Sequence, residues 1–75
     1  MSRILIIGAG CWGTALATVL AKNHRVFLWA RDKKIVDEIN SKHTNSKYFH
    51  KKKLNKKIKS FSGNIESSQF DFIFY

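Results

Sequence analysis

Residues 4–17 read ILIIGAGCWGTALA. An apolar run of strand type leads into the glycine pattern G-x-G-x-x-G at residues 8–13, and helix-forming residues follow at once. We expect Gly8 to permit a sharp turn, Gly10 to leave room for a pyrophosphate against the backbone, and Gly13 to let the helix approach the strand. The free N–H groups of the first helical turn would face the phosphates. The stretch therefore predicts a dinucleotide-binding turn, with a purely structural glycine turn as the alternative.

Hydrophobic periodicity predicts a strand–helix–strand unit around this turn. The helix is expected from Trp12 to Lys22, with Asn23 ending it in the left-handed conformation. The apolar run at residues 26–29 predicts a second strand, parallel to the first because a helical crossover sets two strands in one direction. A second helix, capped by Asp32, is expected to stop near residue 40 or 41.

Beyond the second helix the pattern predicts mostly short elements. Residues 42–57 are expected to form a long loop and residues 58–61 a short strand. A turn, at most one helical turn and another buried strand are expected at residues 62–64, 65–69 and 70–75. The predicted fold class is α/β: an incomplete Rossmann-type dinucleotide-binding unit with a parallel sheet of three to four strands, in which residues 4–7 form the central strand.

Composition limits the size of the fold and the classes of partner. The 75 residues are 44% hydrophobic, which predicts one small folded domain. The formal net charge of +9, with eight lysines between Lys42 and Lys59, also suits a small module that binds nucleic acid. Because no nucleic-acid motif accompanies the lysines, we favour a solvated segment that attracts anionic cofactors or substrates.

Cysteine usage and hydropathy predict the compartment. Cys11 is the only cysteine, which excludes an internal disulfide and fits a reducing environment. The sequence shows no signal peptide and no apolar run near the roughly 18 residues that a membrane span needs. We therefore expect a cytoplasmic protein with no membrane span. His24, His43 and His50 lack a carboxylate at suggestive spacing, so no metal site and no catalytic histidine are predicted.

Longer stretches resemble a known family. GAGCWGTALA at residues 8–17, followed by LWARD at 28–32, EIN at 38–40 and NSKY at 45–48, closely resembles the N-terminal region of NAD(P)-dependent glycerol-3-phosphate dehydrogenase. The resemblance implies a soluble, often dimeric enzyme that interconverts dihydroxyacetone phosphate and glycerol 3-phosphate by hydride transfer, for glycerophospholipid synthesis. It also implies an N-terminal Rossmann domain and a helical C-terminal substrate domain, and this sequence matches only the first part of the former.

The resemblance also implies a set of cofactor-binding residues. Cys11 stands where the family usually has Ser, but the phosphate needs only its backbone N–H. The family's catalytic lysines and substrate-phosphate residues would lie beyond residue 75, so no catalytic residue is assigned. The implied set comprises the glycine turn, two residues beside the pyrophosphate and two near the adenosine end: Gly8, Gly10, Cys11, Trp12, Gly13, Arg31 and Tyr48.

The end of the second strand bears on the choice between NADH and NADPH. A site specific for NAD usually has an Asp or Glu there, which binds the ribose 2′-OH. Here Ala30 occupies that place and Arg31 follows, whose guanidinium can pair with a 2′-phosphate or stack on adenine. We expect NADPH to bind at least as well as NADH. Asp32 is the counter-argument, but we interpret it as the cap of the second helix.

Three aromatic residues near these motifs allow two interpretations. For Trp29 we favour a place in the core. For Trp12 and Tyr48, packing and contact with a cofactor are about equally supported by the sequence.

The apolar strand at residues 70–75 affects the expected domain organisation. At a terminus it would expose an unpaired edge. We therefore expect residues 1–75 to be a truncated N-terminal NAD(P)-binding domain that lacks the C-terminal substrate domain and is inactive alone. Glycerol 3-phosphate or dihydroxyacetone phosphate would then bind only in a full-length relative. The alternatives are a non-catalytic remnant of a decayed gene and a small basic nucleic-acid-binding module.

Overall fold

The centre of the protein is a four-stranded parallel sheet. The computed structural model describes residues 2–75, apart from the side chains of His50 and Lys51. The strands lie in the order β5-β2-β1-β6, and all three pairings are parallel. Their bounds are β1 Arg3–Ile7, β2 Arg25–Trp29, β5 Lys59–Phe61 and β6 Phe72–Phe74. This order, third-second-first-fourth among the four strands, is that of a Rossmann half-sheet. The predicted α/β fold class and the interior position of β1 are confirmed.

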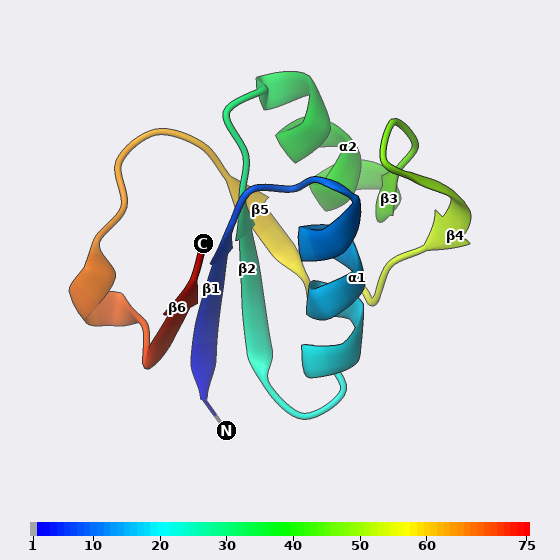
Figure 1. Cartoon of the computed structure of the whole chain (residues 1–75). Helices are drawn as coiled ribbons and strands as arrows, with labels where there is room; N and C mark the ends of the chain where they lie inside the picture. The colour runs from blue at the N-terminus through cyan, green and yellow to red at the C-terminus, as the bar shows by residue number, and fades with distance from the viewer. Residues whose placement is uncertain (1) are drawn as a thin grey trace.

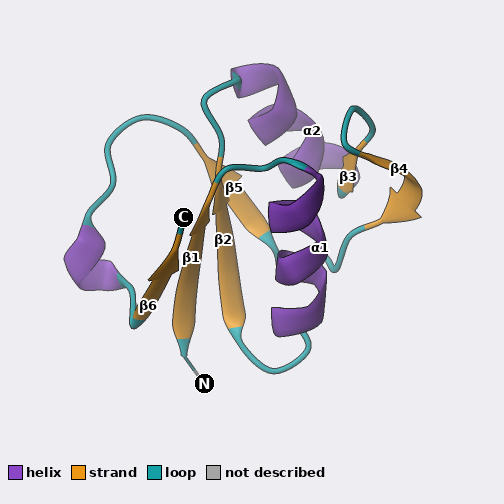
Figure 2. Cartoon of the chain, viewed as in Figure 1, coloured by secondary structure: helices purple, strands orange, loops and turns teal. Residues whose placement is uncertain are grey.

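Two helices cover one face of the sheet. They are α1 (Cys11–Leu20) and α2 (Lys33–Lys42), which lie to the right of β1 and β2 in Figure 1 and are purple in Figure 2. Alternate residues of β1 and β2 face them because side chains along a strand alternate between the two faces. The resulting core includes Ile4, Ile6, Ala17, Val26, Leu28 and Ile39. None of the helices described within residues 2–75 is long and apolar enough to cross a membrane.

The opposite face is covered by the connection between β5 and β6. This connection carries the short helix η1 (Ser67–Gln69), to the left in Figure 1. After η1, the Phe70 ring packs on Phe27 with centroids 5.4 Å apart, and on Phe61 at 6.4 Å. The Arg3 side chain donates from Nε to the Gln69 carbonyl over 2.8 Å and lies over the Phe27 ring. These contacts tie the connection to the sheet. The short strand expected at residues 58–61 is confirmed as β5, and the expectation of at most one helical turn at 65–69 is confirmed by η1.

The C-terminal ends of both helices differ from the prediction. The expected left-handed Asn23 is wrong, because His43 is the only non-glycine residue with positive φ among those described. Ala21 stays in the right-handed region, and the N–H of Asn23 bonds back to the Leu20 carbonyl over 3.2 Å, so this turn closes without a left-handed residue. The second helix runs to Lys42, past the predicted end, and His43 ends it at φ 57°.

The loop expected at residues 42–57 contains a β-hairpin, so that prediction is wrong. The antiparallel strands are β3 (Thr44–Asn45) and β4 (Phe49–Lys53), with an irregularity between Thr44 and Asn45. This hairpin brings the intervening residues 46–48 toward the helix side of the sheet.

The last strand is paired but not buried, which corrects the prediction for residues 70–75. Phe72 is 56% exposed and Phe74 39% exposed. Both lie opposite β1 residues that face the helices, Ile4 and Ile6. Because β6 is the edge strand and α1 packs on β1 and β2, no helix covers these two rings within residues 2–75.

Candidate functional site

A cleft of about 350 Å³ opens at the carboxyl ends of β1 and β2. In Figure 1 this end of the sheet is at the top, where β1 leads into α1 and β2 leads into α2. Ligands of open α/β sheets bind outside the carboxyl ends of the strands. Four segments line the cleft, namely the glycine turn, the end of β2, α2 and the β3–β4 hairpin: Gly8, Ala9, Gly10, Trp29, Ala30, Arg31, Asp32, Ile35, Lys47 and Tyr48.

Each glycine of the turn has a distinct structural role. Gly8 adopts φ 109°, a left-handed conformation that other residues rarely adopt, and its N–H bonds to the Trp29 carbonyl. A Cβ on Gly13 would lie 2.2 Å from the Gly8 carbonyl oxygen, so only glycine allows α1 to approach β1 this closely. A Cβ on Gly10 would meet no atom within 4 Å. The predicted sharp turn and close approach are confirmed, and the space beside Gly10 is open.

The first turn of α1 is available to an anion. Its N-cap is Gly10, which makes no side-chain capping hydrogen bond, and the first turn contains no acidic residue. The initial N–H groups of a helix have no partner within the helix and carry the positive end of its dipole. A phosphate group is the natural acceptor for such a terminus.

Four of the seven predicted site residues come together in the cleft. Gly8, Gly10, Arg31 and Tyr48 line it, although Arg31 and Tyr48 come from elements far apart in sequence. The other three belong to the start of α1. Of these, Cys11 and Trp12 are exposed, Trp12 at 65%, whereas Gly13 is buried. Trp12 is therefore not a core residue.

Comparison with known families identifies the source of this arrangement. Residues 3–71 match the family model described as the N-terminus of NAD-dependent glycerol-3-phosphate dehydrogenase. The chain belongs to this family.

Curated members of the glycerol-3-phosphate dehydrogenase family are similar over most of the chain. The enzyme named glycerol-3-phosphate dehydrogenase (NAD(P)+) from Staphylococcus carnosus (strain TM300) is 42% identical over 71 residues, which cover 93% of this chain and 21% of that protein. Its counterpart from Bacillus thuringiensis (strain Al Hakam) is 55% identical over 49 residues, covering 64% and 14%. The chain thus spans about a fifth of the length of the first of these relatives.

Solved structures of glycerol-3-phosphate dehydrogenases share the fold. The crystal structure of the Coxiella burnetii enzyme superimposes with a TM-score of 0.82 at 33% identity, over 96% of this chain and 23% of that one. The Plasmodium falciparum enzyme gives 0.73 at 33% identity, over 83% and 20%. Both the sequence and the fold of the chain therefore correspond to the N-terminal part of glycerol-3-phosphate dehydrogenase.

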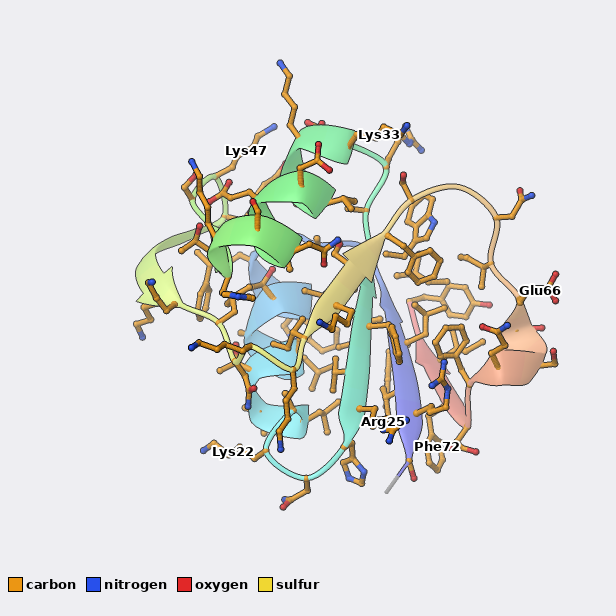
Figure 3. The ribbon with its side chains drawn as sticks, turned by 180° about the vertical axis from the view of Figure 1, so that it is seen from behind. Lys22, Arg25, Lys33, Lys47, Glu66 and Phe72 are labelled. Carbon is orange, nitrogen blue, oxygen red and sulfur yellow. The ribbon has the colours of Figure 1, made fainter. Side chains whose placement is uncertain are left out.

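Two basic side chains line the cleft, those of Arg31 and Lys47. Lys47 also lies over the Tyr48 ring, with Nζ 5.2 Å from the ring centroid. Figure 3 labels Lys47 and Lys33 at the same end of the molecule, on either side of α2. The carboxylate of Asp32 accepts the Lys34 N–H over 2.8 Å, which confirms its predicted role as the cap of α2.

Trp29 and Lys47 are cleft residues that the sequence did not indicate. Trp29 is half-buried at the rim, where its Nε1–H donates to the Gly63 carbonyl over 2.9 Å, so its expected place in the core is wrong. Lys47 resembles the other lysines of its segment in sequence. Only the resemblance of NSKY at residues 45–48 to the family distinguishes its surroundings.

A carboxylate on α2 holds the hairpin turn in place. Glu38 accepts hydrogen bonds from the Thr44 hydroxyl over 2.6 Å and from the Ser46 N–H over 2.8 Å. The hydrogen bond from Thr44, followed by that from the Ser46 N–H, lowers the pKa of Glu38 from its ordinary value of 4.5. Because residues 44–46 immediately precede Lys47 and Tyr48, Glu38 helps to fix this wall of the cleft.

The histidines have other surroundings. Nδ1 of His24 accepts the Ser2 N–H over 3.4 Å, and His43 ends α2. The side chain of His50 lies outside the described residues. Among the side chains that are described, no three His, Cys, Asp or Glu groups gather in a way that could hold a metal ion.

Proposed function

We propose that this chain is the cofactor-binding part of an oxidoreductase that interconverts dihydroxyacetone phosphate and glycerol 3-phosphate with NADPH or NADH. The observation that carries the proposal is the start of α1, which has no side-chain cap, lies beside the open space at Gly10 and belongs to a cleft also lined by Arg31 and Tyr48. Membership of the glycerol-3-phosphate dehydrogenase family supports the reaction class.

Each predicted residue has a role in this proposal. Gly8 and Gly13 shape the turn, while the backbone at Gly10, Cys11 and Trp12 receives the pyrophosphate. Arg31 and Tyr48 form the wall for the adenosine end. When bound, the nicotinamide would supply or accept the hydride. Hydride transfer also requires a bound carbonyl substrate and a proton donor. We assign neither role to a residue of this chain.

We expect the cleft to bind NADPH at least as well as NADH. Ala30 provides no carboxylate at the end of β2, and Asp32 uses its Oδ1 to accept the Lys34 N–H as the cap of α2. Arg31 is exposed at the cleft, where its guanidinium suits a 2′-phosphate. This electrostatic balance supports binding of the more highly charged cofactor.

The test is a titration of the 15N-labelled chain with NADPH and with NADH, followed by two-dimensional amide NMR. We expect dispersed peaks, with selective shifts at residues 8–13 for both nucleotides and an additional NADPH effect at Arg31. A folded chain whose spectrum neither nucleotide changes would overturn the proposal.

The variant Gly10→Ala separates binding from folding. Its methyl group meets no atom within 4 Å, so the fold should remain and the free energy of unfolding should fall by about 1 kcal/mol or less. The same methyl group would fill the space proposed for the pyrophosphate, and we expect the shifts at residues 8–13 to disappear. If Gly10→Ala bound NADPH as tightly as the wild type, the pyrophosphate would not lie where we propose.

A further inference from the structure

Asn45 joins the hairpin to the glycine turn through a buried amide. Its side chain is fully buried, and Nδ2 donates to the Ala9 carbonyl over 2.8 Å and to the Thr14 hydroxyl oxygen over 3.0 Å. Both acceptors flank the turn, one before and one after the start of α1. Among the described residues no donor reaches Asn45 Oδ1, so the NH2 group carries the contacts of this amide.

The Thr14 hydroxyl closes a three-membered network. It is fully buried and donates to the same Ala9 carbonyl over 3.4 Å. Ala9 stands between two glycines, Gly8 and Gly10, whose torsions are the least restricted in the chain. The network therefore supplies a constraint that the local sequence lacks.

Fixing the Ala9 carbonyl also fixes the next N–H group. The peptide bond between Ala9 and Gly10 is planar and trans, so the Gly10 N–H points opposite to the carbonyl. Because the carbonyl points at the buried amide of Asn45, the Gly10 N–H points away from it. Gly10 itself lines the cleft.

The same residue holds the opposite wall of the cleft. The main-chain carbonyl of Asn45 accepts the Tyr48 N–H over 3.2 Å, which closes the turn that carries Lys47 and Tyr48. One side chain and one carbonyl of Asn45 thus connect the turn at residues 8–10 to the wall at residues 47–48.

We propose that Asn45 is a positioning residue for dinucleotide binding, which holds the Ala9–Gly10 peptide and the Tyr48 turn in their binding geometry without touching the ligand. This inference rests on the proposed function, since it assigns a residue to that same cleft. It predicts that Asn45 affects NADPH and NADH equally, because both share the pyrophosphate.

The experiment compares Asn45→Ala with Asn40→Ala in the 75-residue chain. Asn40 makes two similar hydrogen bonds, with the carbonyl and the N–H of Ser60, but joins α2 to β5 away from the cleft. Dissociation constants for NADPH and NADH are measured by NMR titration, and melting temperatures by circular dichroism. We expect Asn45→Ala to raise both dissociation constants about tenfold and to shift the Gly10 amide resonance. We expect Asn40→Ala to lower only the melting temperature.

Thr14→Val serves if Asn45→Ala fails to fold. It removes the hydroxyl of the network while keeping a similar side-chain shape. It should raise the dissociation constants for NADPH and NADH by the same factor. If Asn45→Ala or Thr14→Val bound both nucleotides like the wild type, the inference would be wrong although the proposed function stood. A wild-type chain that binds neither nucleotide would overturn the proposed function, and with it this role of Asn45.

Discussion

Arg31 is the residue that we propose as the determinant of cofactor choice. Its guanidinium is exposed at the cleft, and Oδ1 of the neighbouring Asp32 accepts the Lys34 N–H. We predict that Arg31→Ala raises the dissociation constant for NADPH about tenfold, because a charged hydrogen bond is lost. The dissociation constant for NADH should rise by less than about threefold. The control Arg25→Ala removes the same charge at the other end of β2, far from Lys47 in Figure 3. Equal losses for both nucleotides on titration of Arg31→Ala would contradict recognition of a 2′-phosphate.

At the scale of single residues, the sequence predicts those structural roles that depend only on the local backbone. The roles of Gly8 and Gly13 follow from spacing alone, since the strand, turn and helix they serve are adjacent in sequence. Asn45 could not be found in this way, because its side chain meets Ala9 across 36 residues. Polar residues in a lysine-rich segment give no periodic signal that would single out Asn45 or Lys47.

Glu38 is the contact that attaches the hairpin to α2. It accepts from Thr44 and Ser46, and these bonds lower its pKa below the ordinary 4.5. A carboxyl group whose pKa is lower in the folded chain stabilises the fold above its unfolded pKa, and this contribution is lost as pH falls through the lowered folded pKa. We predict that Glu38→Gln lowers the free energy of unfolding by about 1 kcal/mol at pH 7. The difference should shrink below about pH 4.5.

Urea unfolding followed by tryptophan fluorescence at pH 7 and pH 3 measures this difference. Glu66→Gln is the matched control, because Glu66 precedes η1 and makes no side-chain capping bond there. A Glu38→Gln effect that was the same at both pH values would show that the carboxylate charge does not hold the hairpin.

Elements were predictable where hydrophobic periodicity marks them. The strands β1 and β2 are continuous apolar runs and both helices repeat their apolar residues at helical spacing, and the sequence predicts these elements to within about two residues at each end. The strand β4, FHKKK, contains one apolar residue, so its pairing comes from the contacts of β3 and not from its own pattern. The end of α2 at His43 escaped prediction because neither Gly nor Asn marks it.

On the scale of the whole molecule, the strand β6 is the edge of the sheet that carries exposed aromatic side chains. Phe72 and Phe74 are exposed there, whereas Phe70 packs between Phe27 and Phe61. We predict that the double variant Phe72→Ser, Phe74→Ser reduces binding of the dye ANS while changing the free energy of unfolding by about 0.5 kcal/mol or less. Phe70→Ser should instead destabilise the fold by about 2 kcal/mol and increase dye binding.

Dye fluorescence and urea unfolding of the same samples distinguish these effects. Unchanged dye binding by the double variant would mean that Phe72 and Phe74 do not form the apolar surface that binds the dye.

The position of β1 between β2 and β6 has a consequence for synthesis on the ribosome. The strand β1 is translated first, but it pairs with its second neighbour only after β6 has been translated. The Arg3 N–H then donates a hydrogen bond to the Asp71 carboxylate, 68 residues later in the sequence. All the residues that line the cleft are translated by Tyr48, about one to several seconds before β6 at ordinary elongation rates. A nascent chain therefore contains every residue of the cleft while only β1 and β2 of the four strands have been translated, so a nucleotide could bind before β5 and β6 join the sheet.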